Sequence, residues 1–147
     1  METPDLTKQP PRSPRVRLGG FALLPRMLDK CRATIAGKQG ENHYNCPNDQ
    51  LFLDFAGVDP EALKREVAGG KGDGEILEWI TANAKHKRTA PEIGAWTAFV
   101  EQRAPDNPDS RAYFNELHQK AGPKRTDIVS WADLLDLDDY VSFGGKA

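Results

Sequence analysis

Long apolar runs are missing from this sequence. No stretch approaches the roughly 18 consecutive apolar residues that a membrane-spanning helix needs. The first twenty residues, METPDLTKQPPRSPRVRLGG, also lack the apolar core of a secretory signal. We therefore expect a protein that neither crosses a membrane nor is exported, and we expect a cytoplasmic location.

Cysteine and excess positive charge are scarce as well. The chain has two cysteines in 147 residues and a formal net charge of -2. In the cytoplasm Cys31 and Cys46 are expected to be free thiols, so no disulfide framework is predicted. A slightly acidic protein has no global positive field that would draw it onto nucleic acid, so we expect no nucleic-acid partner.

The short basic run KHKR, residues 85–88, is interpreted as the end of a helix, where cations complement the helix dipole.

Strand signals are almost absent. No segment alternates apolar and polar residues over more than a few positions, whereas Gly and Pro punctuate a series of short apolar stripes with helical spacing. The sequence therefore predicts an all-α fold, a compact single domain of six or seven short helices within residues 21–147. The predicted helices cover about 25–36, 47–56, 60–68 and 74–86, and further helices begin near 90, 108 and 131.

Residues 1–20 are predicted to form an irregular arm rich in proline and arginine. Proline is incompatible with a helix interior and favours extended backbone. We expect this arm to lie on the surface or to be loosely held, in preference to acting as a dedicated binding arm. The prolines are Pro4, Pro10, Pro11 and Pro14, and the arginines among them are Arg12, Arg15 and Arg17.

Several motifs of the chain resemble one bacterial family. They are LPRMLDKCRA, HYNCPNDQ followed by FLDFAGVD, and Trp79 within GDGEILEWI. Together they resemble the family labelled domain of unknown function 5069, from about Leu18 onward. The resemblance implies a compact, largely helical bacterial domain, and it implies no catalytic residue.

A metal site is the first hypothesis for the residues that precede the second predicted helix. Cys31, His43 and Cys46 have metal-ligand side chains with the spacing C-x11-H-x2-C. A structural zinc site needs a fourth ligand, and the other histidines lie far along the chain. Cys31 also falls in the apolar stripe of the first predicted helix, where a cysteine is ordinarily a small hydrophobic residue. We therefore expect no metal and no cofactor.

Thiol chemistry is the second hypothesis for this stretch. Cys46 precedes Pro47 at a helix N-terminus, where the helix dipole favours a thiolate, and His43 is close enough in sequence to act as a base. Asp49 opposes a charged thiolate, because it places a carboxylate in the same turn. An ordinary helix start, capped by Asn45 or Cys46 with Asp49 bonding back to free N–H groups, is favoured over an enzyme that uses His43, Cys46 and Asp49.

An anion-binding site is the third hypothesis. Arg26 and Lys30 lie one turn apart on the first predicted helix, away from its apolar stripe, and Tyr44 can add a hydroxyl. The alternative for this helix face is a solvated surface that also carries Asp29 and Arg32. The leading functional prediction is a binding module for an anionic small molecule or a protein partner, with self-association as a further alternative.

Overall fold

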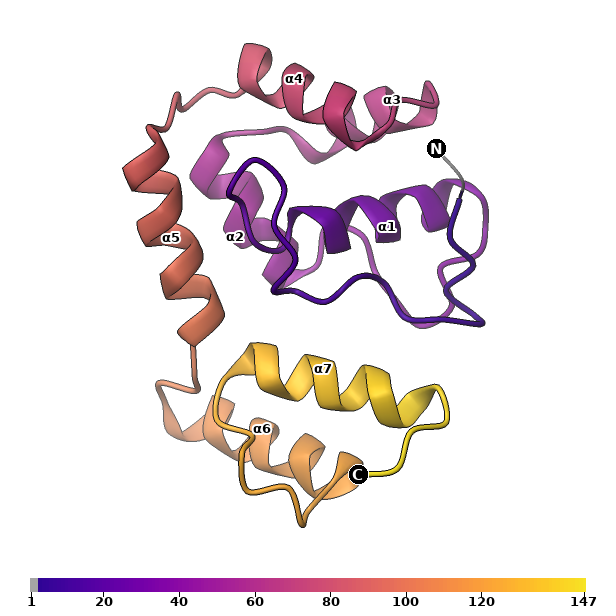
Figure 1. Ribbon diagram of the computed structural model, residues 1–147, viewed down its shortest axis with the longest axis vertical. Helices are drawn as coiled ribbons and strands as arrows, with labels where there is room; N and C mark the ends of the chain where they lie inside the picture. The colour runs from indigo at the N-terminus through magenta and orange to yellow at the C-terminus, as the bar shows by residue number, and fades with distance from the viewer. Residues whose placement is uncertain (1–2) are drawn as a thin grey trace.

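The structure is a computed structural model that describes residues 3–147. Within this range it contains seven α-helices and no β-strand (Figure 1). The predicted all-α class and the single compact unit are therefore confirmed. None of the helices between residues 3 and 147 is long and apolar enough to cross a membrane. The helices are α1 (Leu24–Ile35), α2 (Pro47–Ala56), α3 (Pro60–Ala68), α4 (Asp73–Asn83), α5 (Ala90–Gln102), α6 (Pro108–Ala121) and α7 (Trp131–Ser142).

Helices α3, α5, α6 and α7 each begin at a polar residue whose side chain accepts a helix N–H. At the start of α5 the N–H of Glu92 donates to Thr89 Oγ1 at 3.3 Å, and the N–H of Thr89 donates to Glu92 Oε1 at 2.9 Å. At the start of α3 the N–H of Ala62 donates to the side chain of Asp59 at 2.8 Å. These bonds satisfy N–H groups that have no partner inside the helix, and they therefore determine where each helix starts.

The end of α4 differs from the sequence prediction. The sequence predicts a helix to about His86, but α4 ends at Asn83. The reason is a long-range contact: the N–H of Lys85 donates to Gly57 O at 2.9 Å and the N–H of His86 donates to Ala56 O at 3.1 Å. The segment after α4 therefore binds carbonyl groups at the end of α2 and cannot continue its own helix.

Helix α1 lies at the centre of the larger hydrophobic cluster of the molecule. Ten consecutive residues, from Leu24 to Ala33, are buried. In Figure 1 α1 runs between α3 and α4 on one side and the N-terminal arm and α7 on the other. A helix enclosed in this way buries its polar side chains together with its apolar ones. The core around it includes Leu28, Cys31, Phe52, Leu63, Ile76 and Ile80.

The N-terminal arm is irregular, as predicted, and the part from residue 3 onward is packed against the rest of the chain. The side chain of Leu6 is 2% exposed, and its N–H donates to Lys38 O at 2.9 Å. Pro11 and Pro14 are also buried. Because a Cβ at Gly40 would lie 2.9 Å from Leu6 O, glycine permits the close approach of the arm to the α1–α2 loop. The arm therefore forms one wall around α1.

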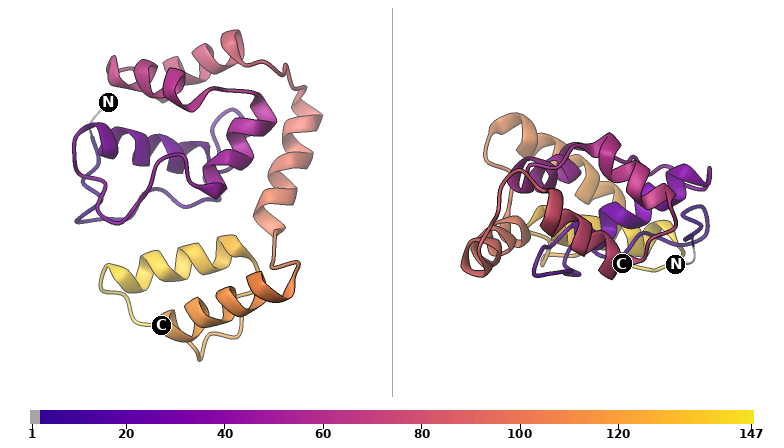
Figure 2. Two further views of the ribbon diagram at one scale, coloured as in Figure 1. Left: turned by 180° about the vertical axis from the view of Figure 1, so that it is seen from behind. Right: turned by 90° about the horizontal axis from the view of Figure 1, so that it is seen from above.

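Helices α6 and α7 form a second, smaller hydrophobic cluster. Its buried residues are Phe114, Ile128, Leu134 and Leu137. Helix α5 runs from the α4 side of the molecule down to this cluster, as the left view in Figure 2 shows. Trp96 holds α5 against α2, because its ring stacks on Phe55 at 5.0 Å with an angle of 6° between the planes. The arm and α1 face α7 across ion pairs that Arg15 and Arg26 form with aspartates of α7.

Candidate functional site

The charged residues of α1 are buried and paired. Arg26, Asp29, Lys30 and Arg32 are each no more than 7% exposed. The expectation of a solvated surface for Asp29 and Arg32 is therefore wrong, because the arm and the neighbouring helices enclose this face and supply opposite charges. The pairs are Arg26–Asp139 at 2.7 Å, Asp29–Arg12 at 2.9 Å, Lys30–Asp49 at 2.8 Å and Arg32–Asp73 at 2.8 Å.

Three of the predicted site residues meet at the start of α2. The ammonium group of Lys30 lies 2.8 Å from Asp49 Oδ1 and 3.2 Å from Cys46 Sγ. Asp49 Oδ2 also accepts the N–H of Asn45 at 2.9 Å. Asn45 has a φ of +64°, a conformation that asparagine tolerates better than most residues. Asp49 thus bonds back to the helix start, as the capping interpretation expects, and it also neutralises a buried lysine.

His43 lies apart from this group. Its side chain is exposed, and it has no hydrogen bond or ion pair to Cys46 or Asp49 within residues 3–147. Cys46 itself precedes α2 and makes no capping bond through its side chain. The use of His43, Cys46 and Asp49 for catalysis stays a prediction, and the neighbour that the structure gives to the thiol is Lys30.

Tyr44 is directed to a different partner. Its hydroxyl donates to Pro60 O at the start of α3, at 2.7 Å. Burial raises the pKa of the Tyr44 hydroxyl above its ordinary value. The three predicted binding side chains, Arg26, Lys30 and Tyr44, therefore have three separate partners, and their role in binding an anion stays a prediction.

The cysteine within α1 is part of the core. Cys31 is completely buried, and burial raises the pKa of its thiol to about 12. Between residues 3 and 147 the structure holds no group of three or more His, Cys, Asp or Glu side chains that could bind a metal ion. Both cysteines are free.

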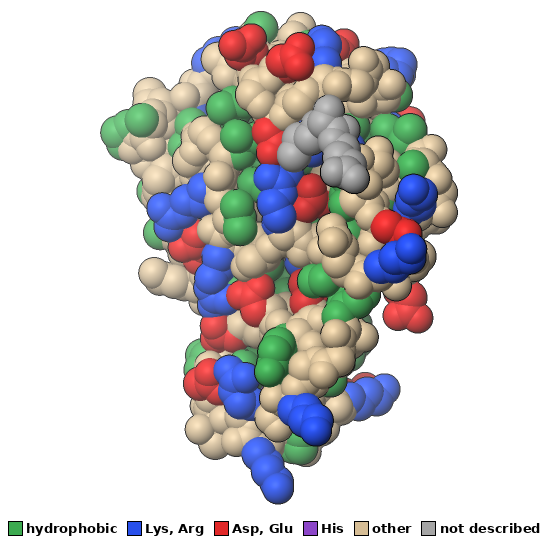
Figure 3. Space-filling model, turned by 45° about the vertical axis from the view of Figure 1, so that its right-hand side comes forward, with side chains coloured by type: hydrophobic (Ala, Val, Ile, Leu, Met, Phe, Trp, Pro, Cys, Tyr) green, Lys and Arg blue, Asp and Glu red, His purple; other side chains and the backbone are tan. Residues whose placement is uncertain are grey.

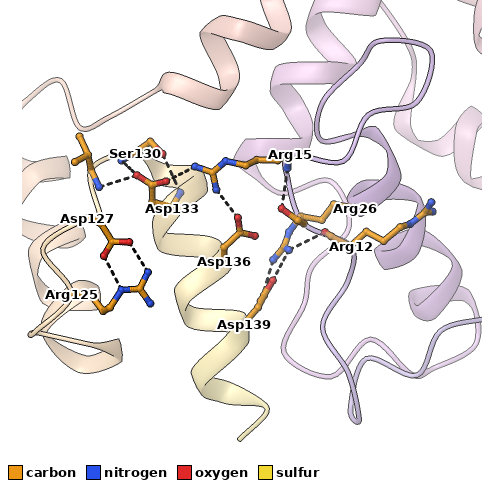
Figure 4. Close-up of polar contacts among 11 residues, drawn as sticks. Arg12, Arg15, Arg26, Arg125, Asp127, Ser130, Asp133, Asp136 and Asp139 are labelled. Carbon is orange, nitrogen blue, oxygen red and sulfur yellow. Dashed lines mark hydrogen bonds and ion pairs between the residues drawn. The ribbon is translucent and has the colours of Figure 1, made fainter. Parts of the chain in front are cut away.

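An arginine–aspartate ladder joins the two hydrophobic clusters, and it was not anticipated from the sequence. Asp133, Asp136 and Asp139 lie at successive turns on one face of α7 (Figure 4). Arg15 of the arm binds Asp133 and, at 2.5 Å, Asp136, while Arg26 of α1 binds Asp139. The spacing of three residues between these aspartates indicates an acidic helix face, and only the tertiary structure shows which cations cover it.

A groove of about 570 Å³ opens beside the Arg26–Asp139 pair. Leu6 and Glu41 lie on its arm and loop side, and Asp138 lies on its α7 side. The charged residues that line it are Arg26, Glu41, Asp138 and Asp139, three carboxylates against one guanidinium. Burial, followed by the neighbouring carboxylate of Asp139, raises the pKa of Asp138 above its ordinary value. The groove is thus acidic.

The basic run 85–88 has structural partners. Lys87 Nζ donates to Thr81 O at 2.8 Å at the end of α4. Arg88 Nε donates to Phe55 O at 2.9 Å, and its guanidinium lies 4.3 Å from the centre of the Phe55 ring. These cations therefore complement the C-terminal ends of two helices. On the face shown in Figure 3, basic and acidic side chains are interspersed, without a continuous basic stripe.

The chain matches the model of a family described as domain of unknown function (DUF5069) over residues 8–141. The match covers most of the chain, so the protein belongs to this family, as the sequence motifs indicate. No curated protein matches the chain. The matched range contains most of the arm, the central α1 and nearly all of α7, and it includes the four charged residues that line the acidic groove.

Proposed function

We propose that the protein acts by binding a partner protein, and that the binding site is the acidic groove between the arm and α7. The observation that carries this proposal is the groove itself, about 570 Å³ in volume and lined by three carboxylates and one guanidinium. Of the residues that the sequence proposes for ligand binding, Arg26 lines this groove.

The charge of the groove favours a cationic group of the partner. The guanidinium of Arg26 is already paired with Asp139 at 2.7 Å, which leaves the carboxylates of Glu41 and Asp138 in excess. A lysine or arginine side chain of a partner complements that excess. An anionic small molecule at Arg26 or Lys30 would have to displace a buried carboxylate from its partner, which is costly. Of the two occupants predicted from the sequence, the protein partner is therefore the better supported.

The test is a titration of the full chain with a lysine- and arginine-rich peptide at low ionic strength, followed by calorimetry. Replacing Asp138 with Asn or Glu41 with Gln should weaken binding by up to about fivefold each, the range of exposed charge pairs. Added salt should weaken it further. Glu78→Gln, an exposed carboxylate of α4, is the matched control and should leave the affinity unchanged. Equal affinity of Asp138→Asn, Glu41→Gln and the unsubstituted chain would contradict the proposal.

The enzyme alternative with His43, Cys46 and Asp49 retains a direct test. The rate of alkylation of Cys46 is measured against pH. A midpoint at or above the free-thiol value of about 8.5 removes the argument for an activated thiolate. A midpoint well below that value, lost in His43→Ala, supports it.

We further infer a cytoplasmic location and a bacterial source. The two free cysteines, Cys31 and Cys46, support the first inference, because thiols stay reduced in the cytoplasm. The resemblance of the sequence motifs to a bacterial family supports the second. Self-association is the further alternative, and light scattering over a range of concentrations would detect it.

A further inference from the structure

Lys30 and Cys46 form a contact that the proposed binding groove does not use. Lys30 Nζ lies 3.2 Å from Cys46 Sγ. The lysine is 5% exposed and belongs to α1, whereas Cys46 is half-buried and directly precedes α2. A desolvated amine is thus held against the sulfur of a residue that is only partly buried.

The thiol has no structural task that would prevent its reaction. Cys46 makes no capping hydrogen bond, so the start of α2 does not depend on its sulfur. The start of the helix is instead held by Asp49, which accepts the N–H of Asn45. The side chain of Cys46 is therefore available for covalent chemistry.

We propose that Cys46 and Lys30 form a covalent sulfenamide cross-link when a peroxide oxidises the thiol. Peroxide oxidises cysteine thiolates to sulfenic acids, and a sulfenic acid condenses with a nearby thiol or nitrogen. The structure places a primary amine, Lys30 Nζ, 3.2 Å from Cys46 Sγ, within hydrogen-bond distance. The modification site is thus the pair of residues, and its co-reactant is hydrogen peroxide or an organic peroxide.

The atoms and electrons balance in two steps. In the first step one hydrogen peroxide converts the Cys46 thiol to a sulfenic acid, S–OH, and leaves as water after oxygen transfer, so the sulfur loses two electrons and the peroxide gains them. In the second step the ammonium group of Lys30 passes one proton to the carboxylate of Asp49, which lies 2.8 Å from Nζ, and this frees the lone pair of the amine. The amine then attacks the sulfur, the N–S bond forms and the S–O bond breaks, and a second proton of the amine joins the departing hydroxyl to give water.

The surroundings favour this product over a disulfide. Cys31 is completely buried, and burial raises the pKa of its thiol to about 12, so it is a poor nucleophile. Transfer of the proton from Lys30 to Asp49 also removes both buried charges at once, so the condensation leaves no unpaired ion in the core. The cross-link ties the middle of α1 to the first turn of α2.

The test uses the full chain treated with hydrogen peroxide, digested with trypsin and measured by mass spectrometry. Trypsin does not cleave after a modified lysine. The expected product is peptide 27–32 joined to peptide 39–64, with the loss of two hydrogen atoms and with the peptide that ends at Lys30 missing. Because a disulfide has the same mass loss, the experiment is repeated in Cys31→Ala, where the cross-link should persist. A thiol reductant should reverse it.

Two further variants keep the test decisive. Cys46→Ser should show normal cleavage after Lys30. Lys30→Arg keeps a positive charge beside Asp49 and removes the primary amine, so peroxide should leave a sulfenic acid at Cys46 that dimedone traps. The proposal is overturned if the unsubstituted chain also stops at a dimedone-trapped sulfenic acid, if the product is a Cys31–Cys46 disulfide, or if Cys46 is not oxidised.

Discussion

The ammonium group of Lys30 and the carboxylate of Asp49 form an ion pair of 2.8 Å with side chains that are 6% and 2% exposed. The pair joins the middle of α1 to the first turn of α2. Both charges have left water, so each depends on the other for compensation. The consequences for stability follow from this dependence.

Removing one partner of this ion pair should destabilise the fold strongly. Lys30→Met leaves Asp49 buried without a cation, and we expect the free energy of unfolding to fall by about 3–5 kcal/mol. The measurement is urea-induced unfolding followed by circular dichroism. Lys120→Ala, which removes the exposed pair with Glu116, is the control and should change the free energy by about 1 kcal/mol or less. Similar effects of the two substitutions would contradict the role assigned to Lys30.

The turn after α2 should require glycine. Gly57 has a φ of +69°, and a Cβ there would lie 2.6 Å from Lys85 Cβ. Gly57→Ala should therefore lower the free energy of unfolding by more than about 1 kcal/mol. Gly94→Ala is the matched control, because Gly94 lies within α5 and faces open space. That substitution should raise stability by about 0.5–1 kcal/mol, since alanine is the better helix former. A stabilising Gly57→Ala would be inconsistent with this turn.

The ionised carboxylate of Asp73 should stabilise the fold at neutral pH, and this contribution should be lost in acid. Burial tends to raise the pKa of Asp73, but hydrogen bonds from Arg12 and Arg32 outweigh it and lower the pKa below its ordinary value of 3.8. A carboxyl with a lower pKa in the folded state stabilises the protein above its unfolded pKa, and this contribution is lost as the pH falls through the folded pKa. Asp73→Asn should therefore be less stable than the unsubstituted chain at neutral pH. Unfolding curves over a pH series should show this difference shrinking below about pH 4; a difference independent of pH would contradict the prediction.

The two cysteines should differ in reactivity. Cys31 is completely buried with a pKa of about 12, so iodoacetamide should not label it in the folded protein at mildly alkaline pH. Cys46 is half-buried and should be labelled. The measurement is intact mass before and after denaturation. In Cys46→Ser the folded protein should take no label and the denatured protein should take one; labelling of the folded variant would show that the core around Cys31 is open.

Local features of the fold were predictable from the sequence. Thr89 and Glu92 have the three-residue spacing typical of a capping box, and their reciprocal hydrogen bonds form one at the start of α5. Cys31 falls in an apolar stripe, and the structure places it in the core. The end of α4 was not predictable, because it depends on carbonyl groups of Ala56 and Gly57 that are distant in sequence.

In the candidate site, too, the sequence indicated the residues but not their long-range partners. The sequence proposed Arg26 and Lys30 as one anion-binding surface. The structure assigns Arg26 to Asp139, which is 113 residues away in the chain, and Lys30 to Asp49 and Cys46. Neither pairing has a periodicity that would reveal it, so the neutralisation of these charges could not be inferred from the chain alone.

The sequence by itself determined the all-α class and the starts of most helices, because caps and apolar periodicity act over a few residues. Only the tertiary structure decided that α1 is enclosed, which of its charges are neutralised, and that an acidic groove lies between the arm and α7. The physical reason is the distance along the chain between the residues that interact. A capping hydrogen bond is formed within one turn, whereas the ion pair of Arg26 with Asp139 exists only after the chain has brought α1 and α7 together.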